Sequence, residues 1–179
     1  MSDTLITIIA IGLSAILMFV FPVITMADRV NTASQSDIET MTSEFINEIK
    51  TTGKLTRDRY SKFLENLTST GNTYDVSLEF KILDENPGKK KLQEAKDKIG
   101  ENVYYSVYTT QIEEVLDEIE GLGVYYLKEG DIVSATVRNT NLTLAQQLKS
   151  FFYTVSGTDI YTIQASQSGL VTSTGTLIE

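Results

Sequence analysis

The most prominent pattern in the chain is an uninterrupted run of 23 uncharged positions, Leu5–Ala27. Its only polar side chains are Thr7, Ser14 and Thr25, whose hydroxyls can bond to the backbone of their own helix. At about 1.5 Å per residue, a helix of this length spans roughly 35 Å, which is enough to cross the hydrocarbon core of a bilayer. We therefore predict that residues 1–27 form a membrane-spanning helix.

A cleavable secretory signal is the alternative interpretation of this run. The sequence Thr25-Met26-Ala27 offers small residues at a possible cleavage site before Asp28. Against it, the run is longer than the usual apolar region of about 7–15 residues, and no basic segment precedes it. These features favour a retained helix. The Thr-, Ser- and Tyr-rich remainder of the chain favours an N-terminus inside the cell and a head outside the cytoplasm.

Small and helix-breaking residues interrupt the apolar run. Gly12 loosens a helix, and Pro22 removes one amide donor and clashes with the preceding turn. We therefore predict a kink or a locally unwound stretch between them. Ala10 and Ser14 form a pair of small residues four apart, a spacing that allows close helix–helix approach. The pair is compatible with an ordinary lipid-facing anchor and also with packing against copies of the same helix.

The pattern changes after Asp28, but no Pro or Gly ends the helix before Gly53. Apolar residues recur at helical spacing on one face, at Val30, Ile38, Met41, Phe45 and Ile49. Residues 28–52 are therefore predicted to be an amphipathic continuation of the first helix. Together, residues 3–52 would form one helix on the order of 75 Å long.

Residues 53–171 are predicted to form an α+β head. Thr56 is placed to cap a helix that carries Tyr60, Phe63, Leu64 and Leu67 on one face. Residues 74–82 alternate between apolar and polar, which is typical of a half-buried strand. Thr110 and Glu113 match a capping box for a helix with Ile112, Val115, Leu116 and Ile119 on one face.

The second half of the head is predicted from turn signals. Residues 124–127 and 131–137 flank Lys128-Glu129-Gly130, which reads as a hairpin. Asn141 then caps a helix that runs through Phe152, and a last strand follows at about residues 160–165. We expect a mainly antiparallel sheet of about four strands, with helices on one face, and a loosely held tail at residues 172–179.

Charge and composition narrow the possible functions. The 179 residues carry a formal net charge of −9, which argues against a nucleic-acid partner. Cysteine and histidine are both missing, so thiolate nucleophiles, the usual zinc sites and histidine acid–base chemistry are excluded. No pair of carboxylates is singled out by its spacing. We therefore expect no catalytic site, no metal site and no cofactor.

The head is rich in tyrosine, and the chain has nine tyrosines in all. Most of these residues are expected to have core or subunit-contact roles, because tyrosine buries area while its hydroxyl stays in water. Stacking on a sugar or another ligand is the alternative. Asn66-Leu67-Thr68 and Asn141-Leu142-Thr143 match the glycosylation sequon, which is a weak signal in an unknown host.

Asp3 is the most informative single residue, because it is the only carboxylate before Asp28. A carboxylate just ahead of an apolar helix can pair with the N-terminal amine of a neighbouring subunit, and a dry environment strengthens such a pair. The alternative is a hydrated residue at the level of the lipid headgroups.

An uncharged N-terminal helix with a proline, continuing into an amphipathic half under a small α+β head, resembles the type IV pilin superfamily. Within it, the layout is most similar to the TadE-like minor pilins and pseudopilins of tight-adherence systems. The resemblance implies that the apolar helices leave the membrane and bundle into a filament core. It also implies that Asp3 neutralises a neighbour's amine and that Pro22 is the helix breaker. Unlike the family, this chain has no Glu within the apolar run.

These observations favour a structural subunit of a cell-surface filament or of its secretion apparatus. Its partners would be copies of itself, the membrane before assembly and the pilus or secretion machinery. The candidate assembly residues are Asp3, Ala10, Gly12, Ser14 and Pro22. The alternative is a membrane-anchored sensor or accessory domain whose extracytoplasmic head binds a ligand or another protein.

Overall fold

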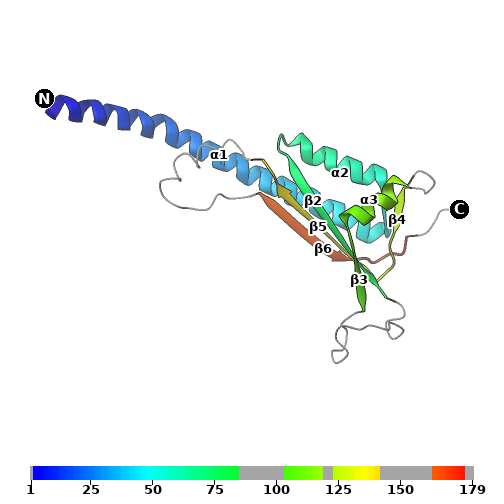
Figure 1. The fold of residues 1–179 in the computed structure, drawn as a ribbon. Helices are drawn as coiled ribbons and strands as arrows, with labels where there is room; N and C mark the ends of the chain where they lie inside the picture. Colours follow the sequence, from blue (N-terminus) through cyan, green and yellow to red (C-terminus); the bar gives the residue numbers. More distant parts are fainter. Residues whose placement is uncertain (1, 85–102, 119–122, 142–162, 176–179) are drawn as a thin grey trace.

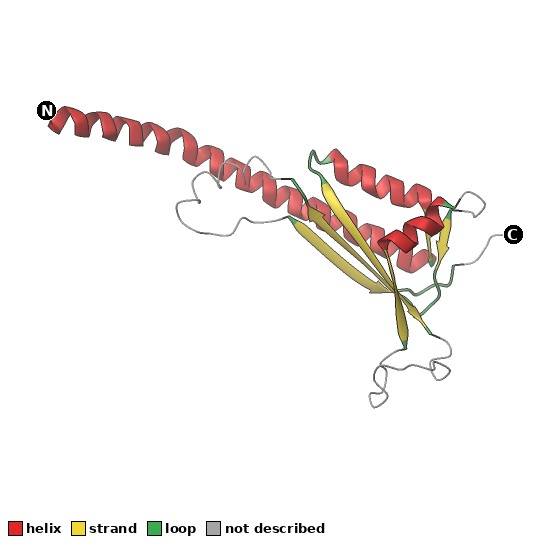
Figure 2. Ribbon diagram, in the orientation of Figure 1, coloured by secondary structure: helices red, strands yellow, loops and turns green. Residues whose placement is uncertain are grey.

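The computed structural model describes residues 2–84, 103–118, 123–141 and 163–175, and it confirms the α+β class (Figures 1 and 2). A long N-terminal helix packs on antiparallel strands together with two shorter helices. In chain order, the elements are α1 (Ser2–Thr52), β1 (Lys54–Thr56), α2 (Arg57–Ser69), β2 (Tyr74–Leu83), β3 (Tyr104–Tyr108), α3 (Thr109–Asp117), β4 (Val124–Tyr126), β5 (Ile132–Asn139) and β6 (Gln164–Leu170).

Helix α1 is continuous over 51 residues and contains Pro22. The unwound stretch predicted between Gly12 and Pro22 is therefore wrong, and Figure 1 shows a gentle curve without a sharp kink. Proline removes only one backbone hydrogen bond from the helix, whereas unwinding would leave several more backbone groups without partners in an apolar segment. The Thr25 hydroxyl also donates to the carbonyl of Phe21 at 2.9 Å, next to the proline.

The second half of α1 forms part of the core of the head. Ile38, Phe45 and Ile49 are buried and Met41 is half-buried, which confirms most of the predicted apolar face; Ile46, which was not predicted, is buried as well. Val30 is the exception, because 62% of it is exposed. Its neighbour Asn31 is already buried, and at about 100° per residue Val30 lies roughly 80° around α1 from Ile38, away from the middle of the packed face.

The head is built around a four-stranded antiparallel sheet in the order β3-β2-β5-β6. Leu78 and Phe80 of β2, and Val133, Ala135 and Val137 of β5, point to one face and are fully or almost fully buried. Buried side chains of α1, α2 and α3 belong to the same hydrophobic cluster, so the helices cover one face of the sheet. The predicted sheet with helices on one face is confirmed.

Strand β6 lies later in the chain than expected, at Gln164–Leu170 rather than at about residues 160–165. Its sequence is rich in small and polar residues, which have weak strand propensity. Strand β6 pairs with β5 along its whole length and packs closely on α1, where a Cβ built on Gly169 would meet the flexible end of the Lys50 side chain. These contacts with distant parts of the chain place β6 in the sheet, and local propensity does not reveal them.

The predicted hairpin around Lys128-Glu129-Gly130 is wrong, although its turn exists. Strand β4 pairs with β1 in a separate two-stranded sheet, whereas β5 pairs with β2 and β6. The N–H of Asp131 donates to the carbonyl of Lys128 at 3.1 Å, and Gly130 has φ +97. The Asp131 carboxylate also accepts the N–H groups of Lys128 and Leu83, both at 2.8 Å, so the side chain holds a corner between the two sheets.

Helix α3 begins one residue earlier than the predicted cap at Thr110. The side chain of Gln111 accepts the N–H of Tyr108 at 3.1 Å, and this bond replaces the expected capping box. The Thr109 hydroxyl accepts the N–H of Leu78, and Glu113 accepts the hydrogen bond of the Tyr60 hydroxyl.

The short strands β1 and β3 were not predicted, whereas α2 with its Thr56 cap and β2 agree with the sequence. The predicted helix from Asn141 to Phe152 lies almost entirely outside the described residues.

The segment at residues 172–175 is held more closely than a loose tail. The N–H of Thr172 donates to the carbonyl of Lys50 at 3.0 Å, and that of Gly175 donates to Leu127 at 2.9 Å. Leu127 in turn donates to Gly53 at 2.8 Å, directly after the end of α1. This C-terminal strap, residues 172–175, therefore closes over the junction between α1 and β1.

The strap leaves no room for a side chain at Gly53. This residue has φ +63, and a Cβ built on it would overlap the carbonyl oxygen of Ser173. We expect Gly53→Ala to destabilise the head by about 3 kcal/mol, from the left-handed backbone and the overlap together. Gly71→Ala is the matched control, because Gly71 has φ +82 but open space around it. It should lose only about 1 kcal/mol. Equal losses in chemical unfolding of the two variants would contradict the close contact.

The partly buried hydrogen bond from the Tyr60 hydroxyl to Glu113, 2.8 Å long, predicts that the stability of the head depends on pH. Burial, followed by the bond to Glu113 and its charge, raises the pKa of Tyr60 well above its ordinary value. The unfolded chain therefore releases this proton near pH 10 while the folded head retains it, so stability falls as pH rises above about 10. Tyr60→Phe should make this alkaline loss shallower in unfolding curves measured between about pH 8 and 11.

Tyr108→Phe is the control for this effect, because Tyr108 is 57% exposed. It should leave the alkaline slope of the parent protein unchanged. If Tyr60→Phe also kept that slope, the assignment of the alkaline loss to Tyr60 would be wrong.

Candidate functional site: the bare half of the long helix

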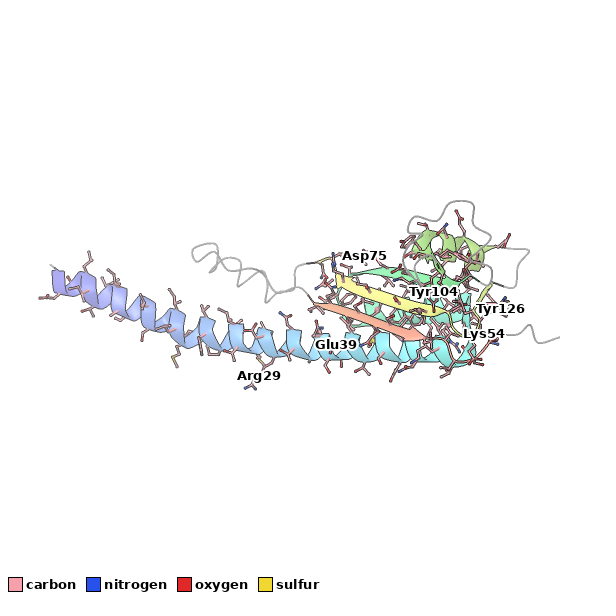
Figure 3. All side chains as sticks on the ribbon, turned by 90° about the horizontal axis from the view of Figure 1, so that it is seen from below. Arg29, Glu39, Lys54, Asp75, Tyr104 and Tyr126 are labelled. Carbon is pink, nitrogen blue, oxygen red and sulfur yellow. The ribbon has the colours of Figure 1, made fainter. Side chains whose placement is uncertain are left out.

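The first half of α1 extends beyond the head with its apolar side chains in the open (Figure 3). The most apolar 18-residue window in the helix has a mean hydropathy of 2.6, and none of it is buried. The large exposed side chains are Leu5, Ile6, Ile8, Ile9, Ile11, Leu13, Ile16, Leu17, Met18, Phe19, Phe21, Val23 and Met26. By length and composition, this helix can cross a membrane.

Exposure on this scale distinguishes the segment from a core helix of a soluble protein. Soluble monomers rarely expose contiguous apolar patches larger than a few hundred Å². In the described part of the chain the head does not cover the segment. Its apolar surface is therefore available to lipid or to other protein chains.

Asp3 lies in the first turn of α1, where its side chain is exposed. A carboxylate at this position is stabilised by the positive end of the helix dipole. Its backbone carbonyl accepts the Thr7 hydroxyl at 2.7 Å. The position agrees with a hydrated residue and equally with a carboxylate that lies near a neighbour's amine.

The structure brings together three of the five predicted assembly residues. At about 100° per residue, Ala10 and Ser14 lie on the same side of α1 as Asp3, two and three turns further along. Gly12 lies on the opposite side, and a Cβ built on it has nothing within 4 Å. Pro22 is exposed and lies roughly 100° away from Asp3 around the helix.

The same face carries polar residues that sequence reasoning did not connect. Within an arc of roughly 60° lie all three hydroxyl side chains of the apolar run, Thr7, Ser14 and Thr25. We call this face the polar stripe: Asp3, Thr7, Ala10, Ser14, Thr25 and Asp28, with Phe21 between Ser14 and Thr25 as its one large apolar side chain. The spacing of the three hydroxyls in the sequence could have revealed this face, provided that α1 stays helical between Gly12 and Pro22, where a kink or unwound stretch was predicted.

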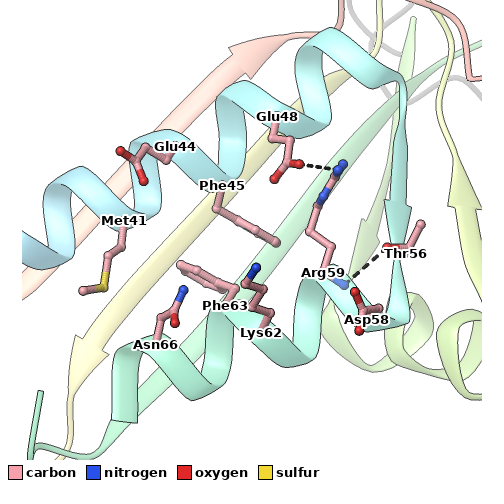
Figure 4. A pocket seen from close by; sticks show the side chains of 10 residues that line it. All are labelled: Met41, Glu44, Phe45, Glu48, Thr56, Asp58, Arg59, Lys62, Phe63 and Asn66. Carbon is pink, nitrogen blue, oxygen red and sulfur yellow. Dashed lines mark hydrogen bonds and ion pairs between the residues drawn. The ribbon is translucent and has the colours of Figure 1, made fainter. Parts of the chain in front are cut away.

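A groove between α1 and α2 marks the point where the helix joins the head (Figure 4). Its floor is made by Phe45 and Phe63, whose rings stack with centroids 4.1 Å apart. On its rim, Arg59 forms an ion pair with Glu48 and donates its backbone N–H to Thr56 at 3.3 Å. These contacts fix α2 against the second half of α1, so we interpret the groove as a packing seam.

The described residues contain no group of three or more carboxylates that could hold a metal ion. Comparison with models of known families, with curated proteins and with solved structures finds no match to this chain. The function must therefore be argued from the exposed helix and from the head it carries.

The exposed apolar surface predicts how a charge in the segment would act. Ile16→Arg places a cation in the middle of the run, at a side chain that is 53% exposed. Transfer of the helix into a bilayer should become about 3 kcal/mol less favourable. We expect a marked shift of the protein from the membrane fraction to the soluble or aggregated fraction.

Val30→Arg is the matched control, because Val30 is 62% exposed but lies beyond the apolar run. It should leave the distribution between fractions unchanged. Full membrane retention of Ile16→Arg would contradict burial of the segment in lipid.

Proposed function

We propose that this protein is a pilin-like structural subunit of a cell-surface filament, or of the secretion apparatus that builds such a filament. The membrane holds residues 1–27 before assembly, and the head lies outside the cytoplasm. During assembly, the same helix leaves lipid and packs against copies of itself. The observation that carries the proposal is the division of one continuous helix, α1, into a bare apolar half and a half buried in the head.

A membrane anchor alone does not require this division. An anchor can be joined to a head by any flexible linker, whereas α1 runs into the core without a break and ends at Thr52 inside the head. Ile38 and Ile49 of that half are completely buried. Continuity fixes each head relative to its own apolar helix, which is what a regular array of subunits requires.

The polar stripe supports packing between such helices. Ala10 and Ser14 allow close approach, and the hydroxyls of the stripe can bond across a helix pair. Side chains on the remaining faces, such as Ile8 and Met18, are large and more than two-thirds exposed. We infer that the stripe faces a neighbouring subunit and that these larger side chains fill the space between subunits.

Asp3 completes the proposed assembly face. Once the helices leave lipid, an amine at the N-terminus of one copy would sit in a dry bundle, where an unpaired charge is costly. The Asp3 carboxylate of a neighbour would neutralise it. This role deepens the resemblance to pilins, whose apolar helices are expected to pack in the same way.

Electron microscopy of protein sheared from cells tests the proposal. The parent chain should give regular filaments, and Asp3→Ala and Ala10→Leu should each abolish them while the protein accumulates in the membrane. Ala33→Leu is the matched control, because it adds the same bulk at an exposed position outside the apolar run. It should leave filament number unchanged.

Two results would count against a filament subunit. One is a parent protein that stays monomeric in the membrane under all conditions. Such a result would favour the anchored sensor or accessory domain. The other is a mature protein that begins at Asp28 and dissolves without detergent, because the run would then be a cleaved signal.

A further inference from the structure

The two outer strands of the four-stranded sheet are open to pairing with another strand. The sheet runs in the order β3-β2-β5-β6, so β3 and β6 form its opposite edges (Figure 1). An edge strand presents backbone N–H and C=O groups that another chain can bind, and charged residues or proline usually block it. Neither kind of residue occurs in β3 or β6, although the chain carries a net charge of −9.

The middle of β6 directs backbone groups away from the sheet. In an antiparallel ladder, alternate residues of a strand bond to the partner strand and the others face outward. The N–H of Val171 donates to the carbonyl of Asp131 at 2.8 Å, in register with the odd-numbered residues of β6. The outward residues are therefore Gln164, Ser166, Ser168 and Leu170. Within the described residues, the outward backbone groups of the last three make no hydrogen bond.

Helix α1 runs in the same direction as β6 and bonds to its edge at both ends. Gln35 bonds to the N–H and the C=O of Gln164 at one end, and Lys50 accepts the N–H of Thr172 at the other. Between these bonds, the side chain of Leu170 is 51% exposed. The bonds fix the direction of α1 relative to β6.

Strand β3 offers a matching edge. Its register with β2 leaves Tyr104 and Ser106 facing outward, and in the described part of the chain their outward backbone groups have no hydrogen-bond partner. Beyond α1, the described residues expose four large apolar side chains, and three of these lie on the two edge strands: Tyr105, Tyr108 and Leu170. Exposed apolar side chains therefore gather where the backbone is open.

The directions of the strands decide which edges can meet. Each strand of the sheet is antiparallel to its neighbours, so β3 is antiparallel to β6 within one chain. A second copy in the same orientation therefore presents its β3 antiparallel to β6 of the first. Antiparallel pairing of two β6 strands would instead need one copy turned end for end. Its α1 would then point away from the membrane that holds the first copy.

We propose that β6 of one copy pairs antiparallel with β3 of the next, so that neighbouring heads share one continuous sheet. In the register that places Ser168 opposite Ser106 of the next copy, Leu170 lies opposite Tyr104 of that copy. Both pairs can exchange two backbone hydrogen bonds. The second pair also joins two apolar side chains on one face of the sheet, a contact that favours this register.

The contact is short, so it depends on the anchors. A few backbone hydrogen bonds between separate chains are weak, but helices that share one membrane raise the effective concentration of their heads. The inference rests on the part of the proposed function that places the apolar halves side by side, and it adds a contact between heads. The cross-linking itself does not use Asp3 or Ala10, so the two proposals can fail separately.

Disulfide cross-linking tests the pairing directly, because the chain has no cysteine of its own. Hydrogen-bonded pairs in an antiparallel sheet have Cα atoms about 5.5 Å apart, a distance that a disulfide spans. Full-length Ser168→Cys and Ser106→Cys chains, mixed in phosphatidylcholine vesicles and oxidised, should form dimers. Each variant alone should not, and a chain with both cysteines should form a ladder of longer oligomers.

Ser77→Cys is the matched control for Ser168→Cys, because Ser77 is also exposed but lies on the inner strand β2. Mixed with Ser106→Cys, it should give only background cross-linking. Leu170→Pro removes an outward N–H and leaves the bonds to β5 in place. The unfolding curve should therefore match that of the parent, while the cross-link between positions 168 and 106 should fall roughly fivefold.

The proposal is overturned if the mixed variants cross-link no better than the Ser77→Cys control, or if Ser168→Cys alone cross-links as well as the mixture. Adding Asp3→Ala to the cysteine variants separates the two proposals, because this change should stop filaments and keep the cross-link in vesicles. Filaments without the cross-link would overturn edge pairing alone. The cross-link without filaments in the parent would support edge pairing and count against the filament subunit.

Discussion

The first half of α1 is apolar apart from its narrow polar stripe and has to be kept away from water, and the rest of this protein is arranged around that requirement. The first half of α1 exposes large apolar side chains on every side, and no part of its most apolar window is covered by the head. Transfer of such a surface from water to lipid or protein is strongly favourable. The stable states open to the chain are therefore those in which another molecule surrounds this segment.

The second half of the same helix has a different role, because it covers the apolar face of the sheet in the head. A sheet with one apolar face needs a cover, and α1 supplies much of it through Ile38, Phe45, Ile46 and Ile49. The strap at residues 172–175 then bonds to Lys50 and Leu127, near the point where the helix ends. The anchor and the core of the head are thus one structural element. A change that shortened α1 would damage both.

The parts of the fold that follow local rules could be predicted from the sequence. Regular spacing revealed the long helix, α2 with its Thr56 cap and the alternating strand β2. The errors arose where distant contacts decide. Gly169 belongs to a strand that pairs with β5 and lies beside Lys50, and the Asp131 carboxylate accepts the N–H of Leu83 at the corner where a hairpin was predicted. Neither partner is close in sequence, so neither contact leaves a local signal.

The candidate site was predictable in position but not in organisation. The run of 23 uncharged residues was enough to locate the apolar segment, and Asp3, Ala10 and Ser14 were identified by residue type. Their alignment with Thr7 and Thr25 depends on α1 remaining helical through Pro22, which the proline itself argued against.

The unbroken backbone of α1 has a mechanical consequence. A continuous helix transmits rotation about its long axis, because each turn is bonded to the next. The face that carries the polar stripe continues to Gln35, whose side-chain amide bonds to the backbone of Gln164 at the start of β6. Any neighbour that sets the rotational angle of the apolar half therefore also sets the direction in which β6 and the sheet point. Rotation of the apolar half about the axis of α1 is therefore passed on to the whole head.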